Sequence, residues 1–125
     1  MSIPMGIGTD IVEVARIKKA HERHGERFLE RILTERERRY CGQYRVPWPH
    51  WAGRFAAKEA ILKALGTGVS SGITWHDIEV VNNREGMPEV ILSAKLQSSY
   101  PGIRFLVSIS HCKEYATATA LLVEG

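Results

Sequence analysis

The hydrophobic pattern of this 125-residue chain changes midway, from the period of a helix to the two-residue period of β-strands. Most helix signals lie before residue 66, whereas the alternating stretches "HDIEVVNN", "PEVILS", "RFLVSIS" and "YATATALLV" follow it. Short turns separate these stretches in pairs, which is typical of hairpins. Helices followed by hairpins predict an α+β fold with a mostly antiparallel sheet packed against helices.

One further strand is expected near the start of the chain, in "IPMGIGTDIV", where Ile3, Met5 and Ile7 alternate with small residues. Gly6 and Gly8 have no side chain, so another backbone or a ligand can lie close to this strand. Helices are expected over residues 12–24, 26–33, 35–43, 49–65 and 94–99. Their predicted ends include a stop at Gly25, a cap at Thr34 and a left-handed cap at Gly66.

The composition is that of an ordinary globular chain, with 44% hydrophobic and 25% charged residues. The length predicts a single domain over residues 1–125. No stretch approaches the roughly 18 to 20 apolar residues of a membrane span, and the first ten residues lack the pattern of a secretory signal. We therefore expect no membrane partner and a cytoplasmic location. The two cysteines, Cys41 and Cys112, are too few for a disulfide framework or a zinc site.

Basic residues concentrate between positions 16 and 45, with ten Lys and Arg against five Asp and Glu, although the net charge of the chain is only +3. Arg16, Lys19 and Arg23 fall on one stripe of the first expected helix. This pattern indicates either an acidic partner or an ordinary solvated helix face. Aromatic residues are not interleaved with the basic ones, as stacking platforms for nucleic acid require, so no nucleic acid partner is expected.

The helix expected over residues 49–65 has charged side chains in unusual places. At about 100° per residue, Glu59 lies on the flank of an apolar stripe, Lys63 follows on the same flank, and Lys58 lies inside the stripe. One interpretation is an i,i+4 ion pair between Glu59 and Lys63. The other is a site for a metal and phosphates, to which Arg54, Lys58 and Lys63 contribute positive charge.

Two other positions allow both a structural and a chemical interpretation. Asp10, between a strand and a helix, either caps the helix or binds a metal together with Glu59. Two carboxylates are what Mg²⁺ takes from a protein when phosphate oxygens and waters fill its other positions. His111 at a strand end is a turn residue, a phosphate ligand or a general base. Ser110 before it lies in no G-x-S-x-G elbow, so it is not a predicted nucleophile.

Three blocks of the chain are similar to a known family: "GIGTDIVEVARI" (6–17), "GRFAAKEAILKALGTG" (53–68) and "VSISHCKEYATA" (107–118). They resemble the signature blocks of the holo-acyl-carrier-protein synthases, the small bacterial type of 4′-phosphopantetheinyl transferase. The resemblance implies a Mg²⁺-dependent enzyme that transfers phosphopantetheine from coenzyme A to a serine of an acidic apo acyl carrier protein and releases adenosine 3′,5′-bisphosphate. It also implies a homotrimer with each site at a subunit boundary.

The resemblance also implies roles for individual residues. The implied catalytic residues are Asp10, Glu59 and Lys63, of which Asp10 and Glu59 bind the metal. The implied coenzyme A-binding residues are Arg54, Lys63, Gly66, Thr67, Gly68, Ser110 and His111. The carrier protein is implied to dock on Arg16, Arg27 and Arg31. The acceptor of the serine proton stays open between a metal-bound water, Glu59 and His111. Residues 41–50 and 93–103 match no motif of the family, and the tryptophans and prolines of "VPWPHW" are expected to alter one wall of the site.

Two other functions are compatible with parts of the sequence. A binding module would use the basic helix to hold RNA or an anionic surface, and would bind heparin without any chemistry on coenzyme A. A Mg²⁺-dependent phosphohydrolase would use the same carboxylates and release nucleotide from coenzyme A without a carrier protein. Three blocks in the same order in one short chain favour the transferase.

Overall fold

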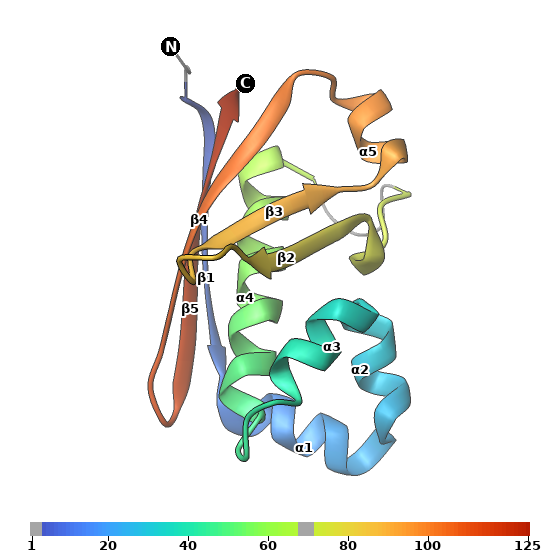
Figure 1. Cartoon of the computed structure of the whole chain (residues 1–125), viewed down its shortest axis with the longest axis vertical. Helices are drawn as coiled ribbons and strands as arrows, with labels where there is room; N and C mark the ends of the chain where they lie inside the picture. The colour runs from blue at the N-terminus through green and yellow to red at the C-terminus, as the bar shows by residue number, and fades with distance from the viewer. Residues whose placement is uncertain (1–3, 68–71) are drawn as a thin grey trace.

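The computed structural model describes residues 4–67 and 72–125, and it confirms the α+β fold (Figure 1). Five strands in these residues form two antiparallel sheets, one in the order β1–β5–β4 and one that pairs β2 with β3. The strands are β1 (Pro4–Glu13), β2 (Ile78–Asn82), β3 (Pro88–Leu92), β4 (Ile103–His111) and β5 (Tyr115–Glu124). The expected hairpins β2–β3 and β4–β5 are both present.

The helices are α1 (Val14–His24), α2 (Glu26–Ile32), α3 (Glu35–Cys41), α4 (Trp48–Leu65) and α5 (Ala94–Ser99), with a short 3-10 helix η2 (Trp75–Asp77). Their ends follow local chemistry. Thr34 and Glu37 form a reciprocal capping box at the start of α3, and Gly66 ends α4 with φ 82°. In the described parts of the chain, no helix has the length and apolar character needed to cross a membrane.

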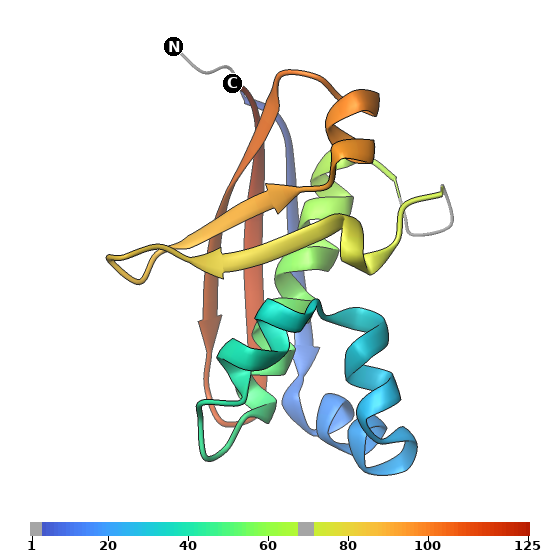
Figure 2. The same ribbon diagram turned by 45° about the vertical axis from the view of Figure 1, so that its right-hand side comes forward.

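Helix α4 lies between the two sheets (Figures 1 and 2). One side packs on the β1–β5–β4 sheet, and the β2–β3 hairpin crosses the other side. The approach to β1 is close because that strand has glycines where it faces the helix. A Cβ at Gly6 would overlap the carbonyl oxygen of Ala64, and a Cβ at Gly8 would overlap that of Ala60. The two glycines therefore let the helix backbone rest on the strand backbone.

The predicted start of the first helix is corrected by the structure. β1 continues to Glu13, because its pairing with β5 extends to Tyr115, and α1 begins only at Val14. Asp10 therefore lies within a strand, opposite Ala118, and does not cap the helix. The N-cap position is Glu13, which makes no side-chain capping hydrogen bond.

A buried ion pair connects α4 to its surroundings. Lys58 Nζ lies 2.5 Å from Glu37 Oε1, and both side chains are fully buried. The same ammonium donates to the carbonyl oxygens of Ile32 and Trp75 at 2.9 Å each, and Glu37 Oε2 accepts the backbone N–H of Val80 at 2.7 Å. Burial lowers the pKa of Lys58, and the Glu37 carboxylate opposes this shift. Lys58 is therefore part of the core, and the expectation that it contributes charge to a phosphate site is wrong.

The face of the β1–β5–β4 sheet that points away from α4 is apolar at several positions. Side chains that face outward alternate along each strand with those that face the helix. Ile7, Leu121 and Leu106 are paired in register across the three strands on this outer face. Ile7 is 69% exposed, Ile11 66% and Leu106 49%. A single chain therefore leaves an apolar band uncovered.

Candidate active site

Asp10, Glu59 and Lys63 lie together where β1 meets α4. Lys63 Nζ is 3.0 Å from Asp10 Oδ1 and donates to the carbonyl oxygen of Thr9, also at 3.0 Å. In the described parts of the chain, no ion pair joins Glu59 to Lys63. The ammonium therefore bridges helix and strand, and the interpretation of Glu59 and Lys63 as a simple helix pair is not supported.

The pKa of Glu59 is raised above its ordinary value. Burial is the main cause, and the negative charge of Asp10 is the second, while Lys63 and Arg16 act in the opposite direction. The two carboxylates are thus close enough to repel each other. A cation between them would remove this repulsion.

The donor set at this position suits a hard divalent cation. Two carboxylates supply oxygen ligands, and the described residues contain no group of three or more His, Cys, Asp or Glu side chains that could hold a metal. An ion bound by Asp10 and Glu59 would therefore take its remaining ligands from substrate and water, as Mg²⁺ does at phosphate-transferring sites.

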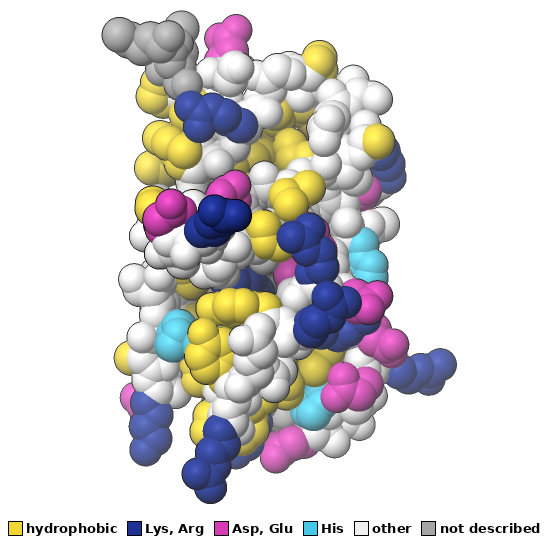
Figure 3. Space-filling model, in the orientation of Figure 1, with side chains coloured by type: hydrophobic (Ala, Val, Ile, Leu, Met, Phe, Trp, Pro, Cys, Tyr) yellow, Lys and Arg dark blue, Asp and Glu magenta, His cyan; other side chains and the backbone are white. Residues whose placement is uncertain are grey.

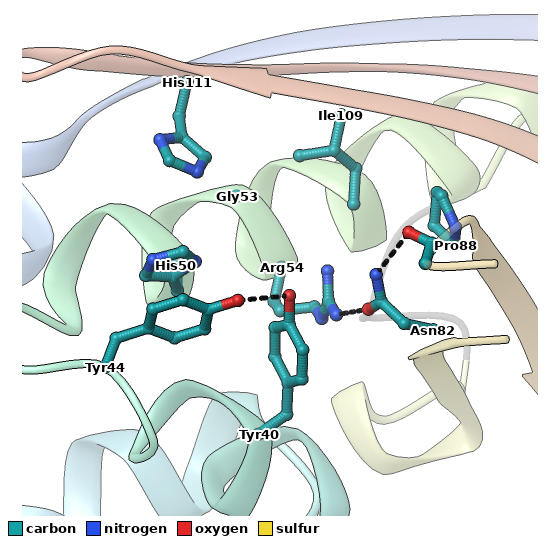
Figure 4. A pocket seen from close by; sticks show the side chains of 10 residues that line it. Tyr40, Tyr44, His50, Gly53, Arg54, Asn82, Pro88, Ile109 and His111 are labelled. Carbon is teal, nitrogen blue, oxygen red and sulfur yellow. Dashed lines mark hydrogen bonds between the residues drawn. The ribbon is translucent and has the colours of Figure 1, made fainter. Parts of the chain in front are cut away.

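A separate pocket of about 240 Å³ lies on the other flank of α4, between α3, β4 and the β2–β3 hairpin (Figure 4). The described residues that line it are aromatic, basic, polar or apolar, and none of them is acidic: Tyr40, Tyr44, His50, Gly53, Arg54, Asn82, Gly86, Pro88, Ile109 and His111. Such a lining favours an anionic ligand with a flat apolar part.

Arg54 is the most unusual side chain of this pocket, because it is only 5% exposed and has no carboxylate partner in the described part of the chain. It donates to the amide oxygen of Asn82 and lies 4.4 Å from the ring centroid of Tyr40. Its Nε is buried and has no hydrogen-bond partner among the described residues. A buried charge requires compensation, so this guanidinium indicates a site for an anion.

Two histidines lie side by side in the same pocket. The ring of His50 stacks on Tyr44 at a centroid distance of 3.5 Å and lies 4.9 Å from the ring of His111. Burial lowers the pKa of His50, and the charges of His111 and Arg54 lower it further. Sequence reasoning assigned no role to His50 or Tyr44, because the pocket joins segments that are distant along the chain.

The two sites lie on opposite flanks of α4. Arg54 and Lys63 are nine residues apart, which is half a turn beyond two full turns at about 100° per residue. Across the sheet, Asp10 and Ile109 both pair with Ala118, so two strand spacings, about 10 Å, separate their backbones. The helix fills the space between them.

Other residues implied at the nucleotide occupy different positions. Gly66 and Thr67 follow the last residue of α4, seven and eight residues beyond Glu59, and Gly68 lies outside the described residues. Ser110 pairs with Thr117 and is exposed on the outer face of the sheet, so the structure does not bring it into the pocket with His111. Their roles stay predictions.

The basic stripe of α1 borders a surface groove. Arg16, Lys19 and Arg23 line it together with Glu13 and His24, and its volume is about 410 Å³. Arg27 and Arg31 are exposed on α2 and do not line this groove. Lys and Arg side chains also project from the lower, helical half of the face in Figure 3, with acidic side chains among them.

Comparison with known proteins gives one family throughout. Residues 6–120 match the model of the 4′-phosphopantetheinyl transferase superfamily. The holo-[acyl-carrier-protein] synthase of Protochlamydia amoebophila is 49% identical over 117 residues, which cover 94% of this chain and 96% of the relative. The enzyme of the same name from Chlamydia pneumoniae is 52% identical over 115 residues, 92% of this chain and 93% of the relative.

Solved structures agree with these sequence relatives. A holo-(acyl-carrier-protein) synthase from Bacillus anthracis, in complex with CoA (3′,5′-ADP), matches with a TM-score of 0.83 and 40% identity, covering 98% of both chains. The Helicobacter pylori holo-[acyl-carrier-protein] synthase in complex with coenzyme A has a TM-score of 0.84 and 34% identity, covering 93% of this chain and 98% of that one.

Proposed function

Because this chain belongs to the holo-acyl-carrier-protein synthase family of the 4′-phosphopantetheinyl transferase superfamily, we propose that it transfers 4′-phosphopantetheine from coenzyme A to a serine of an apo acyl carrier protein in a Mg²⁺-dependent reaction. One observation supports the chemistry above all others. Asp10 and Glu59 lie close enough for the charge of one to raise the pKa of the other, with the Lys63 ammonium 3.0 Å from Asp10.

In this proposal Asp10 and Glu59 hold Mg²⁺, which when bound neutralises the charge of the coenzyme A pyrophosphate. The serine oxygen attacks the phosphorus that bears pantetheine, and the bond from that phosphorus to the adenosine phosphate breaks. Adenosine 3′,5′-bisphosphate leaves, and the hydroxyl proton is released. Lys63 donates hydrogen bonds to the oxygens on which negative charge develops, which is the main contribution that side chains make to phosphoryl transfer.

The pocket on the other flank of α4 receives the nucleotide part of coenzyme A. Arg54 pairs with a phosphate group, and His111 lies across the pocket from it. The aromatic rings of Tyr40 and Tyr44, whose hydroxyl oxygens are 3.0 Å apart, provide the apolar surface. Two family structures are complexes with coenzyme A, which supports coenzyme A as the ligand, and the buried Arg54 without a carboxylate partner among the described residues is the reason to assign its nucleotide part to this pocket.

We further propose that the active assembly is a homotrimer in which two copies complete each site. Helix α4 separates the carboxylate pair from the nucleotide pocket within one chain. We therefore infer that one coenzyme A molecule contacts Asp10 and Glu59 of one subunit and Arg54 of another. The outer face of the β1–β5–β4 sheet supports such an assembly. Ile7 and Ile11 are each about two-thirds exposed there, and an uncovered apolar face is typical of a subunit contact.

The acidic carrier protein docks on the basic groove of α1, with Arg16 at its centre and Arg27 and Arg31 extending the positive surface onto α2. A cytoplasmic location is part of the proposal, because the exposed thiol of Cys112 is unpaired, as is usual in reducing compartments. Charge reversal at Arg16 should raise KM for the carrier and make its binding less sensitive to salt.

The decisive experiment follows the mass of an apo acyl carrier protein incubated with the enzyme, coenzyme A and Mg²⁺. A gain of one phosphopantetheine that EDTA and Glu59→Gln abolish, and that Glu89→Gln preserves, supports the proposal. Glu89 is a matched control because it is an exposed carboxylate on β3. Absence of any gain with several apo carriers refutes the transferase, and nucleotide release without a carrier favours a phosphohydrolase.

A further inference from the structure

His50 lies in the nucleotide pocket without an assigned role. It precedes Trp51 near the start of α4, in the segment that matches no family block. Figure 4 shows its ring behind that of Tyr44, with His111 extending toward it from β4. The 13° angle between the rings of His50 and Tyr44 leaves the edge of the imidazole, where both nitrogens lie, free of the stack.

The groups that face His50 from each neighbouring element are basic or phenolic. Tyr40 on α3 lies 6.3 Å away between ring centroids, Tyr44 precedes α4, His111 is on β4 and Arg54 is one turn along α4. Within residues 4–67 and 72–125, no carboxylate lines this pocket. In the free protein a second positive charge beside Arg54 is therefore unfavourable, and a bound anion would reverse this preference.

We propose that His50 is a further ligand of the nucleotide, and that it binds a phosphate monoester of coenzyme A in its protonated form. This inference rests on the proposed function of the pocket. Arg54 supplies a permanent charge, whereas His50 acquires its proton from solvent as the phosphate enters. Binding at this pocket is thus linked to uptake of a proton, and a charge-assisted hydrogen bond from the imidazolium holds the phosphate oxygen.

The sign of the pH dependence follows directly. In the free protein the lowered pKa keeps His50 neutral near pH 7, because burial, His111 and Arg54 all disfavour the cation. A phosphate dianion raises this pKa in the complex. The additional affinity is therefore present at a pH below the pKa of the complex and is lost as the pH rises above it.

The test compares the wild-type protein with two variants. His50→Phe keeps a ring that can stack on Tyr44 but has no nitrogen that can be protonated, and His50→Gln keeps a hydrogen-bonding group without a titratable one. The ligand is adenosine 3′,5′-bisphosphate, titrated by calorimetry at about pH 6 and about pH 8. The phosphate itself titrates near pH 6, so the quantity of interest is the ratio of Kd between variant and wild type at each pH. His76→Gln is the control, because that histidine lies on η2, where its Nε2 is 2.5 Å from the carbonyl oxygen of Glu30.

We expect both variants at His50 to bind about tenfold more weakly than wild type near pH 6 and nearly equally near pH 8. Histidine NMR signals should show the pKa of His50 rising when the nucleotide binds. The same ratio at both pH values, or a neutral His50 in the complex near pH 6, overturns the inference. Repeating the titration with coenzyme A and with 3′-dephospho-coenzyme A tests the monoester: the pH-dependent ratio should be lost with the dephospho form, and its persistence there would overturn the assignment.

Failure of this inference is distinguishable from failure of the proposed function. Transfer to an apo carrier is therefore measured separately, with the wild-type protein. If the carrier is modified but the ratio of Kd does not change with pH, only the role of His50 is refuted. If no carrier is ever modified, the nucleotide titration still decides whether His50 binds phosphate.

Discussion

The contact between β1 and α4 predicts a large effect from a single methyl group. In Gly8→Ala the new Cβ would overlap the carbonyl oxygen of Ala60 and lie 2.7 Å from the backbone nitrogen of Ala64 and 2.9 Å from Cβ of Lys63. The first two are backbone atoms of a buried helix, so no side-chain rotation relieves the overlap. To restore ordinary contacts of about 3.5 Å, the carbonyl oxygen of Ala60 must move away from the new Cβ by about 1.5 Å, and α4 must move with it.

This displacement has two measurable consequences. Overpacking of this kind costs about 1–3 kcal/mol of the free energy of unfolding, which for a domain of this size lowers Tm by about 4–12 °C. The same movement separates Lys63 and Glu59 from Asp10, since both lie on the segment of α4 that must shift. A misplacement of about 1 Å at reacting groups reduces turnover by about 100-fold. Gly8→Ala should therefore lose far more activity than its remaining folded fraction explains.

Thermal unfolding and single-turnover transfer to an apo carrier, measured well below Tm, test this reasoning. Gly53→Ala is the control for stability, because its Cβ would meet the Cγ2 methyl of Ile109 at 3.1 Å, and that side chain can adjust. The gain in helix propensity, about 1 kcal/mol, should keep its Tm near that of wild type. A Gly8→Ala protein with wild-type Tm and turnover would show that the strand and helix tolerate a wider spacing.

Three more predictions follow from the same geometry. Lys58→Met should lower the free energy of unfolding in urea by about 3–5 kcal/mol, because it leaves the Glu37 carboxylate buried without a cation, and adding Glu37→Gln should recover part of the loss. Without Mg²⁺, Glu59→Gln should have a higher Tm than wild type near neutral pH. A raised carboxyl pKa makes ionised Glu59 destabilising, so the difference should appear as pH rises above the ordinary value of 4.5 and vanish below it. Co-expressed Glu59→Gln and Arg54→Ala subunits, each inactive alone, should regain part of the turnover, and a mixture without activity would contradict sites shared between copies.

The positions of Glu59, Lys63 and Lys58 were predictable because helical periodicity is a local property. The pattern put Lys58 inside the apolar stripe, and the structure confirms its burial. Its partner was not predictable, since Glu37 belongs to another helix and only tertiary packing brings the two together. The alternation of side chains along a strand was not applied to Ser110 and His111. Successive side chains of a strand point to opposite faces, so only one of these two neighbours, His111, can face the pocket.

The nucleotide pocket was the least predictable part of the molecule. Arg54 was expected near phosphates, but its burial depends on Tyr40 from α3 and on Asn82 from the β2–β3 hairpin. Asn82 is 28 residues from Arg54 along the chain. His50 gave no periodic signal, because it lies beside prolines at the start of a helix. Predicting such a site requires knowledge of the strand order and of how the β2–β3 hairpin crosses α4. The residue spacing within a single segment contains neither.

The buried Lys58–Glu37 pair also explains how the nucleotide pocket keeps its shape. Glu37 accepts the backbone N–H of Val80, and Asn82, two residues further on β2, accepts a hydrogen bond from Arg54. Residues two apart on a strand face the same side, so one carboxylate fixes the strand position that orients the partner of Arg54. Lys58 connects that carboxylate to α4, so the helix and the hairpin are joined beside the pocket. The core ion pair and the Arg54 pocket are therefore connected through β2, and we expect Glu37→Gln to weaken the binding of adenosine 3′,5′-bisphosphate in calorimetry although Glu37 does not line the pocket.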